Sequence, residues 1–333
     1  QINMDNVMSE TKHISEMAER VANNLFSIFK WKRKIASDFS WDCVSPDEHG
    51  GKKDHPSDCV FYYRDPYDNE VKYINTDLKS YAKGSITKEQ INKAISSLSY
   101  ATNCAPYNDN WKRLFKPEGN WSVIGMLFVY NHCGEYNGDF NEIVKAVEND
   151  VNHLDNEKMI YIFSPDRIRI LNSIANDINV MIGKEELPSK NHFSFFHPNE
   201  ILTKNHFNHD YSEPATINVL SSPWIIIKHA DCENEKAGYL IYYTKDGSED
   251  DEFDYFIDAL SYYQIINNTS NVRIKLTIKN EFAASNLLNS ISKYYQSLGR
   301  TEKESMQIAN TMVKGTIDLV TPQFSANEIG VLP

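Results

Sequence analysis

Two short apolar segments with acidic residues near their ends constrain the fold of this chain more than any other feature. The first is residues 56–63, PSDCVFYY, and the second is residues 73–79, YINTDLK. Residues 65–69, DPYDN, separate them and favour a hairpin turn. Because side chains alternate between the two faces of a strand, Asp77 and Lys79 point to one side, which Asp58 can approach if the strands pair. Two carboxylates and an amine at one strand end can hold a divalent metal ion and activate a water molecule.

The segments around this pair predict an α/β unit. Apolar residues recur at helical spacing from Thr11 to Lys34. Ser85 or Thr87 can cap a second helix that runs to about Thr102. Residues 121–130, WSVIGMLFVY, are typical of a strand that is buried on both faces. A helix near residues 140–151, a strand at 159–163 and a helix from Pro165 complete the unit near Gly183.

The length of 333 residues is enough for two domains. We expect a first domain over residues 1–183, a linker region over residues 184–222, and a second, accessory α/β domain over residues 223–333. The linker prediction rests on Pro188, Pro198 and Pro214, which lie among polar residues with little periodicity. The sequence contains no recognisable internal repeat.

The net charge of −12 is unevenly distributed along the chain. Residues 1–120 hold 17 of the 34 Lys and Arg residues and 17 of the 46 Asp and Glu residues, so the remainder carries the whole excess of negative charge. Basic clusters at residues 30–34, 52–53 and 112–116 fall in the neutral part together with Asp58, Asp77 and Lys79. This distribution is compatible with a nucleic-acid contact there, although each cluster alone is typical of a solvated surface.

Composition also indicates the compartment. No run of about 20 apolar residues is present, so no membrane-spanning helix is expected. Residues 1–10 lack the basic-then-apolar pattern of a secretion signal. The five cysteines are scattered and form no C-x-x-C pair, which argues against a zinc ribbon and for a reducing environment. We therefore expect a cytoplasmic protein.

The order of a helix, a strand pair with Asp58 and the Asp77-Leu78-Lys79 triplet, a helix and a buried strand resembles the PD-(D/E)XK nuclease superfamily over roughly residues 10–165. The resemblance implies a restriction-endonuclease-like mixed sheet flanked by helices. Asp58 matches the first acid of the motif, although Pro56-Ser57-Asp58 departs from a literal Pro-Asp pair.

The resemblance also implies the roles of the site residues. Asp77 and Lys79 match the second acid and the lysine. A glutamate on the first helix often faces the same pocket, and both Glu19 and Glu16 are candidates for it. Gln90 is the nearest candidate for a polar residue on the following helix.

For chemistry, the resemblance implies Mg²⁺-dependent hydrolysis of phosphodiester bonds in DNA, with Mn²⁺ as a possible substitute. Asp58, Asp77, Glu19 and the Leu78 carbonyl would be metal ligands, and Lys79 would stabilise developing negative charge. The proteins resembled include restriction and anti-phage defence nucleases that work with a second, sensing protein subunit. DNA and such a subunit are therefore the expected partners; a homo-oligomer is possible, and no membrane contact is expected.

Two alternative functions stay open at the level of sequence. The first is a non-catalytic subunit that keeps the nuclease fold and uses it for nucleic-acid or protein binding. The second is a zinc-dependent hydrolase that uses the histidine-rich linker, where His206 and His209 are three residues apart near His192, His197 and Asp210. His49 and His55 flank a Gly-Gly turn ahead of Asp58, and we expect loop polarity to explain both.

Overall fold

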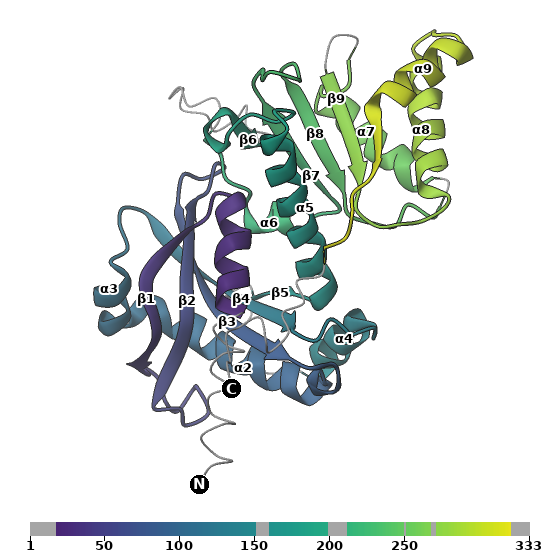
Figure 1. Cartoon of the computed structure of the whole chain (residues 1–333). Helices are drawn as coiled ribbons and strands as arrows, with labels where there is room; N and C mark the ends of the chain where they lie inside the picture. The colour runs from purple at the N-terminus through teal and green to yellow at the C-terminus, as the bar shows by residue number, and fades with distance from the viewer. Residues whose placement is uncertain (1–17, 151–159, 199–211, 250, 268–270, 321–333) are drawn as a thin grey trace, which may run out of the picture. The chain divides into compact units, whose positions relative to one another are not determined.

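The computed structural model describes residues 18–150, 160–198, 212–249, 251–267 and 271–320 (Figure 1). The chain divides into two compact units, the first containing the described residues up to Arg169 and the second containing Ile170–Val320. Each unit is built on its own five-stranded sheet. Within the described ranges, no helix has the length and apolar character that crossing a bilayer requires.

The sheet of the first unit has the strand order β1-β2-β3-β4-β5. Its strands are β1 (Lys32–Asp42), β2 (Asp54–Arg64), β3 (Val71–Tyr81), β4 (Trp121–Asn131) and β5 (Ile160–Phe163). β1, β2 and β3 are antiparallel neighbours, whereas β3, β4 and β5 run parallel. The predicted mixed sheet is thus confirmed, and two of its inner strands, β2 and β3, carry the acidic residues.

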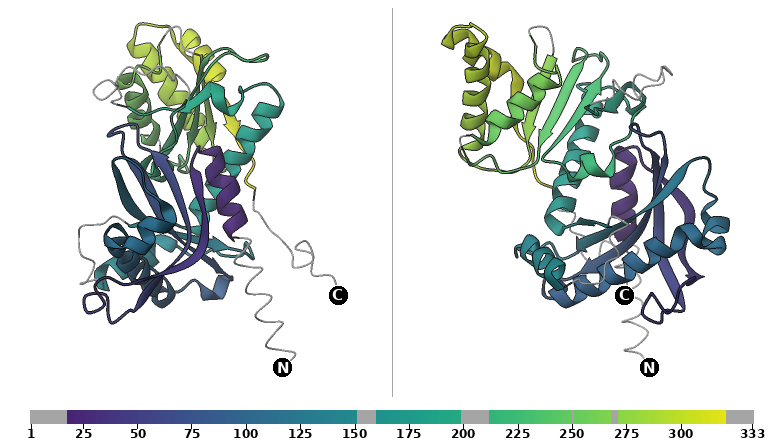
Figure 2. Two further views of the ribbon diagram at one scale, coloured as in Figure 1. Left: turned by 90° about the vertical axis from the view of Figure 1, so that its left-hand side faces the viewer. Right: turned by 180° about the vertical axis from the view of Figure 1, so that it is seen from behind.

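Helices cover both faces of this sheet (Figures 1 and 2). The N-terminal helix, described over residues 18–28, packs on one face through Phe26. α2 (Lys88–Cys104) packs on the other face, and the Thr87 side chain caps it by accepting from the Gln90 amide. The remaining elements before the second unit are η1 (Lys83–Ser85), η2 (Ala105–Tyr107), α3 (Asp109–Phe115), α4 (Phe140–Asp150) and the first residues of α5 (Pro165–Gly183).

The N-terminal helix ends earlier than its periodicity predicts. Lys30 has a φ of 65°, and the Trp31 amide donates to the Phe26 carbonyl at 3.0 Å. Many helices end with a residue in this left-handed conformation, and that residue is usually glycine. The chain then enters β1, so the prediction of a helix continuing to Lys34 is wrong, because a lysine occupies the position where glycine would have marked the end.

An aromatic cluster joins the N-terminal helix to the sheet. Phe26 is fully buried and its ring stacks on Trp31, with centroids 4.5 Å apart. Its centroid also lies 5.0 Å from that of Phe61 on β2 and 5.9 Å from that of Phe128 on β4. Aromatic packing of this kind buries large apolar areas, so it fixes the helix on that face of the sheet.

We expect the substitution Phe26→Ala to lower the free energy of unfolding of the first unit by about 3–5 kcal/mol, because it leaves a cavity beneath the helix. Tyr107 is 71% exposed, so Tyr107→Ala is a matched aromatic control with an expected change of about 0.5 kcal/mol or less. Denaturant unfolding of the full-length chain, followed by tryptophan fluorescence, measures both. Equal destabilisation by the two variants would contradict the assigned packing.

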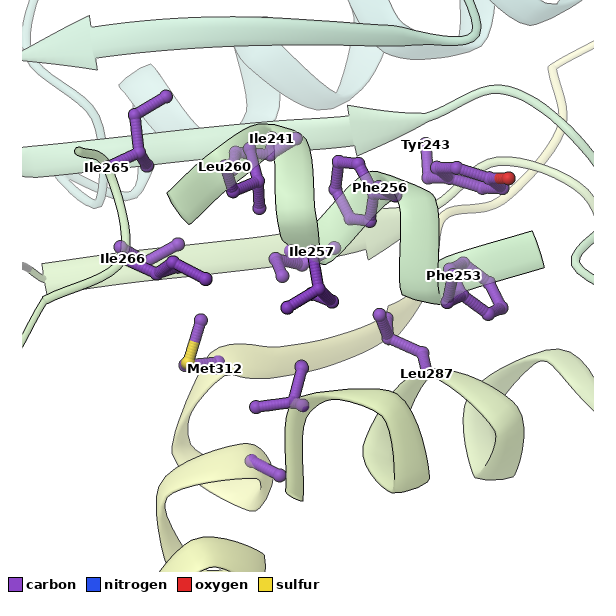
Figure 3. Packing of buried hydrophobic residues seen from close by; sticks show 14 of the residues in the cluster. Ile241, Tyr243, Phe253, Phe256, Ile257, Leu260, Ile265, Ile266, Leu287 and Met312 are labelled. Atoms are coloured by element: carbon purple, nitrogen blue, oxygen red, sulfur yellow. The ribbon is translucent and has the colours of Figure 1, made fainter. Parts of the chain in front are cut away.

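The second unit contains a sheet with the order β10-β9-β8-β7-β6. Its elements after α5 are η3 (Lys190–His192), β6 (Phe193–Phe195), α6 (Ile217–Ser221), β7 (Trp224–His229), β8 (Gly238–Tyr243), α7 (Glu252–Tyr262), β9 (Asn271–Leu276), α8 (Ala283–Ser297), α9 (Glu302–Met312) and β10 (Val313–Thr316). Figure 3 shows how Phe253, Phe256, Ile257 and Leu260 of α7 meet side chains of β8 and of α8 in a buried apolar core. The predicted second α/β region is confirmed.

The two sheets share one topology. β6, β7 and β8 are antiparallel neighbours and β8, β9 and β10 run parallel, as β1 to β5 do in the first unit. A helix also links the third and fourth strands in both units, α2 in the first and α7 in the second. The sequence shows no recognisable internal repeat, so this likeness between the units lies in their strand order and strand directions and not in matching residues.

The unit boundary differs from the predicted one. The first compact unit ends at Arg169, inside α5, and not near Gly183. In the predicted linker region 184–222, β6 pairs antiparallel with β7, and Phe193 and Phe195 are fully buried. The proline-rich composition concealed this short edge strand, so the described part of the region is structural and belongs to the second unit.

Candidate metal-dependent active site

The register of β2 and β3 brings Asp58 and Asp77 together. The last pair of this ladder is Cys59 with Thr76, and Asp58 and Asp77 are the next residue on each strand. Asp58 Oδ2 accepts a hydrogen bond from the Leu78 backbone amide at 2.7 Å. The side chain of Asp58 thereby binds a backbone donor where the ladder between β2 and β3 ends, which fixes the carboxylate beside Asp77.

Lys79 completes the group. Its ammonium Nζ lies 2.5 Å from Asp77 Oδ1, and 34% of the lysine side chain remains exposed. Asp58, Asp77 and Lys79 all line one pocket, together with Pro56, Asn75, Thr76, Ser97, Leu98 and Ala101. The structure thus places three of the predicted site residues in a single pocket between β2, β3 and α2, while their catalytic role stays a prediction.

Burial and the neighbouring charges shift the pKa values of Asp58 and Lys79 in this pocket. Burial, and then the negative charge of Asp77, raise the pKa of Asp58 from its ordinary 3.8 to about 6, against the opposing effects of the Leu78 amide and Lys79. Burial disfavours the ammonium of Lys79, but Asp77 and Asp58 together outweigh burial and raise the pKa of Lys79. The pocket therefore contains a permanent cation and two carboxylates that repel each other, an arrangement that a further cation would stabilise.

The donor set fits a hard divalent cation. Carboxylate oxygens are the ligands that Mg²⁺ and Mn²⁺ prefer, and two of them face one pocket here. Leu78 is not among the residues lining the pocket, and its described contact there is the amide hydrogen bond to Asp58. The Leu78 carbonyl as a ligand remains a prediction.

The structure does not bring Glu19 into this pocket. Glu19 belongs to the N-terminal helix, which packs on the sheet face that carries Phe61, and its carboxylate forms an ion pair with Arg33 of β1. Asp58 is three residues from Phe61 on β2, so it points to the opposite face. The expected placement of Glu19 is therefore corrected, because helical periodicity cannot show which sheet face a helix covers. Glu16 lies outside the described residues.

Sequence reasoning also missed polar residues of the pocket wall. Gln90 is exposed at the start of α2, whereas Ser97 of the same helix lines the pocket. The two are seven residues apart, hence on one helix face but about 10 Å apart along the axis. Asn75 lines the pocket as well and accepts a buried 2.7 Å hydrogen bond from Ser57. The alternation of strand faces could have identified Asn75, which is two residues before Asp77.

The second sheet has no acidic pair at the equivalent described positions. Its hairpin ladder also ends after six pairs, at Trp224 with Tyr243, and the residues next along the strands are Pro223 and Thr244. These positions correspond to Asp58 and Asp77 in the first sheet. The position corresponding to Lys79 is Asp246, which is exposed. The repeated fold therefore carries the carboxylate pair in the first unit and not in the second.

The histidine-rich region does not form a second centre among the described residues. His197 is buried and its Nε2 lies 2.8 Å from the Pro214 carbonyl, while His192 contacts the Ser189 hydroxyl. His206, His209 and Asp210 lie outside the described residues. No observation on the described part of this region favours the zinc-dependent hydrolase.

A mixed five-stranded sheet with helices on both faces, and with Asp58, Asp77 and Lys79 where two neighbouring strands part, defines a PD-(D/E)XK domain. Residues 8–167 match the family model described as the GAPS4 protein PD-(D/E)XK nuclease domain. The N-terminal part of the chain is thus a PD-(D/E)XK domain, and it is followed by a further α/β region. No curated protein and no solved structure matches the chain.

We expect Asp58→Asn to stabilise the metal-free protein near neutral pH by about 1–3 kcal/mol. The pKa of Asp58 rises to about 6 on folding, so the folded chain binds more protons than the unfolded chain between pH 3.8 and that value. Stability is therefore lost as the pH rises through this window. Asparagine keeps an acceptor for the Leu78 amide but cannot ionise.

Urea unfolding with a chelator, at about pH 7.5 and about pH 4, measures this effect. The gain should be present at the higher pH and disappear at the lower one, where the Asp58 carboxyl of the folded chain is neutral, as asparagine is. A gain of the same size at both pH values, or a loss at the higher pH, would rule out the assigned electrostatics.

Proposed function

We propose that the N-terminal unit is a Mg²⁺-dependent nuclease that hydrolyses phosphodiester bonds in DNA and acts as a bacterial defence effector with a partner subunit. The observation that carries the proposal is the convergence of Asp58, Asp77 and Lys79 on one pocket of a PD-(D/E)XK domain. Mn²⁺ is expected to replace Mg²⁺, since it takes similar oxygen ligands.

Each side chain has a distinct role in this proposal. Asp58 and Asp77 would hold the ion, which would supply an activated water molecule and neutralise charge on the phosphate. The Leu78 amide keeps the Asp58 carboxylate in place by donating to it. The Lys79 ammonium, which the two carboxylates keep charged, would stabilise negative charge that develops on the phosphate oxygens.

Charge distribution supports DNA as the substrate of the first unit. Residues 1–120 are electrically balanced within an acidic protein and contain all three basic clusters. In the structure Lys52 lies beside the pocket, because its Nζ donates to the Ser97 hydroxyl at 2.6 Å. Cationic side chains next to the pocket would lower the repulsion that an acidic chain exerts on a polyanion.

A non-catalytic role is proposed for the second unit, and one specific observation favours it. Pro223 and Thr244 stand where the first unit has its two aspartates, so this copy of the topology has no carboxylate pair for a metal ion at these positions. The unit also lies in the part of the chain that carries the excess negative charge, which suits a protein partner better than DNA. We assign it to recognition of the partner subunit or of a second copy of this chain.

We expect Asp77→Ala and Lys79→Ala each to reduce Mg²⁺-dependent DNA cleavage by about 10²–10³-fold or more. Lys72→Ala is the matched control, because Lys72 lies on the same strand but on the opposite face, where it pairs with Asp68 and Glu70. Cleavage of one labelled duplex by all variants, with and without the partner protein, is the measurement, and circular dichroism checks folding.

The expected outcome is a loss for Asp77→Ala and Lys79→Ala and wild-type cleavage for Lys72→Ala. Wild-type rates for both site variants would refute the assignment. Glu19→Gln in the same assay tests the corrected placement, since a glutamate that pairs with Arg33 outside the pocket should affect cleavage far less than Asp77.

A further inference from the structure

Four potential metal ligands gather in the first unit, away from the carboxylate pair. They are Cys43, His49, His55 and Cys104, and one ligand atom from each lies within 4.8 Å of all the others. Cys43 follows β1, His49 sits in the loop before β2, His55 belongs to β2, and Cys104 is the last residue of α2. The topology thus brings a helix end to a loop that is distant from it in the sequence.

Burial contradicts the expectation that loop polarity explains the two histidines. His55 is fully buried and His49 is 7% exposed, whereas a solvated loop would leave such rings in water. Within the described part of the chain, neither ring nitrogen of His55 has a hydrogen-bond partner. A buried imidazole without a partner is costly, and coordination of a metal ion by one of its nitrogens would offset that cost.

The remaining contacts point the ligand atoms toward one another. Cys43 Sγ lies 3.0 Å from His49 Nδ1, and the rings of His49 and His55 have centroids 5.3 Å apart. The Val44 amide donates to Cys104 Sγ at 3.2 Å, a contact that outer-shell donors commonly make with a metal-bound thiolate.

We propose that Cys43, His49, His55 and Cys104 form a closed, structural zinc site. Two sulfur and two nitrogen donors are a set that favours Zn²⁺ in tetrahedral geometry over Mg²⁺, which prefers oxygen. Two thiolates would balance the charge of the ion, so the buried site would be neutral. Bonds of about 2.3 Å to sulfur and about 2.0 Å to nitrogen set ligand-to-ligand separations of about 3.3–3.8 Å in a tetrahedral site. The ligand atoms lie within 4.8 Å of one another and Cys43 Sγ lies 3.0 Å from His49 Nδ1. Adjustments of about 1 Å or less would therefore accommodate the ion.

The zinc site would connect β2 to α2, which both line the pocket that contains Asp58 and Asp77. His55 is three residues before Asp58 on β2, and Cys104 is two turns after Ser97 on α2. Lys52, from the same loop, already bonds to Ser97. Zinc bound here would hold α2 against β2 and so fix the pocket width. Zinc binding by these four residues does not require the proposed nuclease activity.

The full-length chain, expressed without a metal-binding tag and dialysed, provides the test by elemental analysis and zinc X-ray absorption. We expect about one zinc per chain, with two sulfur neighbours at about 2.3 Å and two nitrogen neighbours at about 2.0–2.1 Å. Cys43→Ser and Cys104→Ser should lose the metal. Cys232→Ser in the second unit, and Asp77→Ala in the catalytic pocket, should keep it.

A second measurement uses only the wild-type chain, so it does not require the cysteine variants to fold. Wild-type chain stripped of metal and titrated with Co²⁺ should develop sulfur-to-cobalt charge-transfer absorption and the strong visible bands of a tetrahedral site. Absence of zinc together with absence of these bands would overturn the proposal. So would an oxygen-only coordination shell, a Cys43–Cys104 disulfide in the protein purified under reducing conditions, or retention of zinc by both cysteine variants.

Discussion

The hydrogen bond from the Leu78 amide to the Asp58 carboxylate is the interaction on which the pocket depends. At this point the pairing of β2 with β3 ends, and a strand amide needs a new acceptor. A carboxylate meets that need, and the register places a second carboxylate, Asp77, beside it. Burial, and then repulsion by Asp77, raise the pKa of Asp58 to about 6, so folding leaves the pocket electrostatically unfavourable near neutral pH without a bound cation. Instability of this kind is common where a site serves function instead of stability.

The two units share a topology, so comparing them shows which residues distinguish the pocket of the first unit. Both units have the same strand order, the same strand directions and a helix between the third and fourth strands. Only the first places two aspartates where its hairpin ladder ends; the second has Pro223 and Thr244 there. Proline has no amide and threonine no charge, so the second hairpin can end without creating a cation site. One architecture therefore supports a site in one unit and, as we propose, a recognition surface in the other.

The sequence predicted those structural elements that depend on residues close together in the chain. Alternating apolar residues and a turn of Asp, Pro and Asn predicted the β2–β3 hairpin, and the hairpin alone brings Asp58 to Asp77 and Lys79. β1 was missed because Lys30 takes the place of the expected glycine after the N-terminal helix. Glu19 was misplaced because the face a helix covers is decided by tertiary packing, here by Phe26. The four-residue Cys and His cluster was missed because Cys104 reaches the loop only through the fold. Its other three members are spaced six residues apart, which matches no familiar zinc pattern.

We propose that the first unit holds a divalent cation between Asp58 and Asp77 and that the second unit, with the same topology, holds none at the equivalent positions. Crystals of the full-length chain grown with Mn²⁺, measured on both sides of the manganese absorption edge, test it most directly. We expect an anomalous peak in contact with both aspartates and none at Pro223 and Thr244. Absence of the first peak at a Mn²⁺ concentration that saturates binding in solution, or a peak of equal height in the second unit, would contradict it.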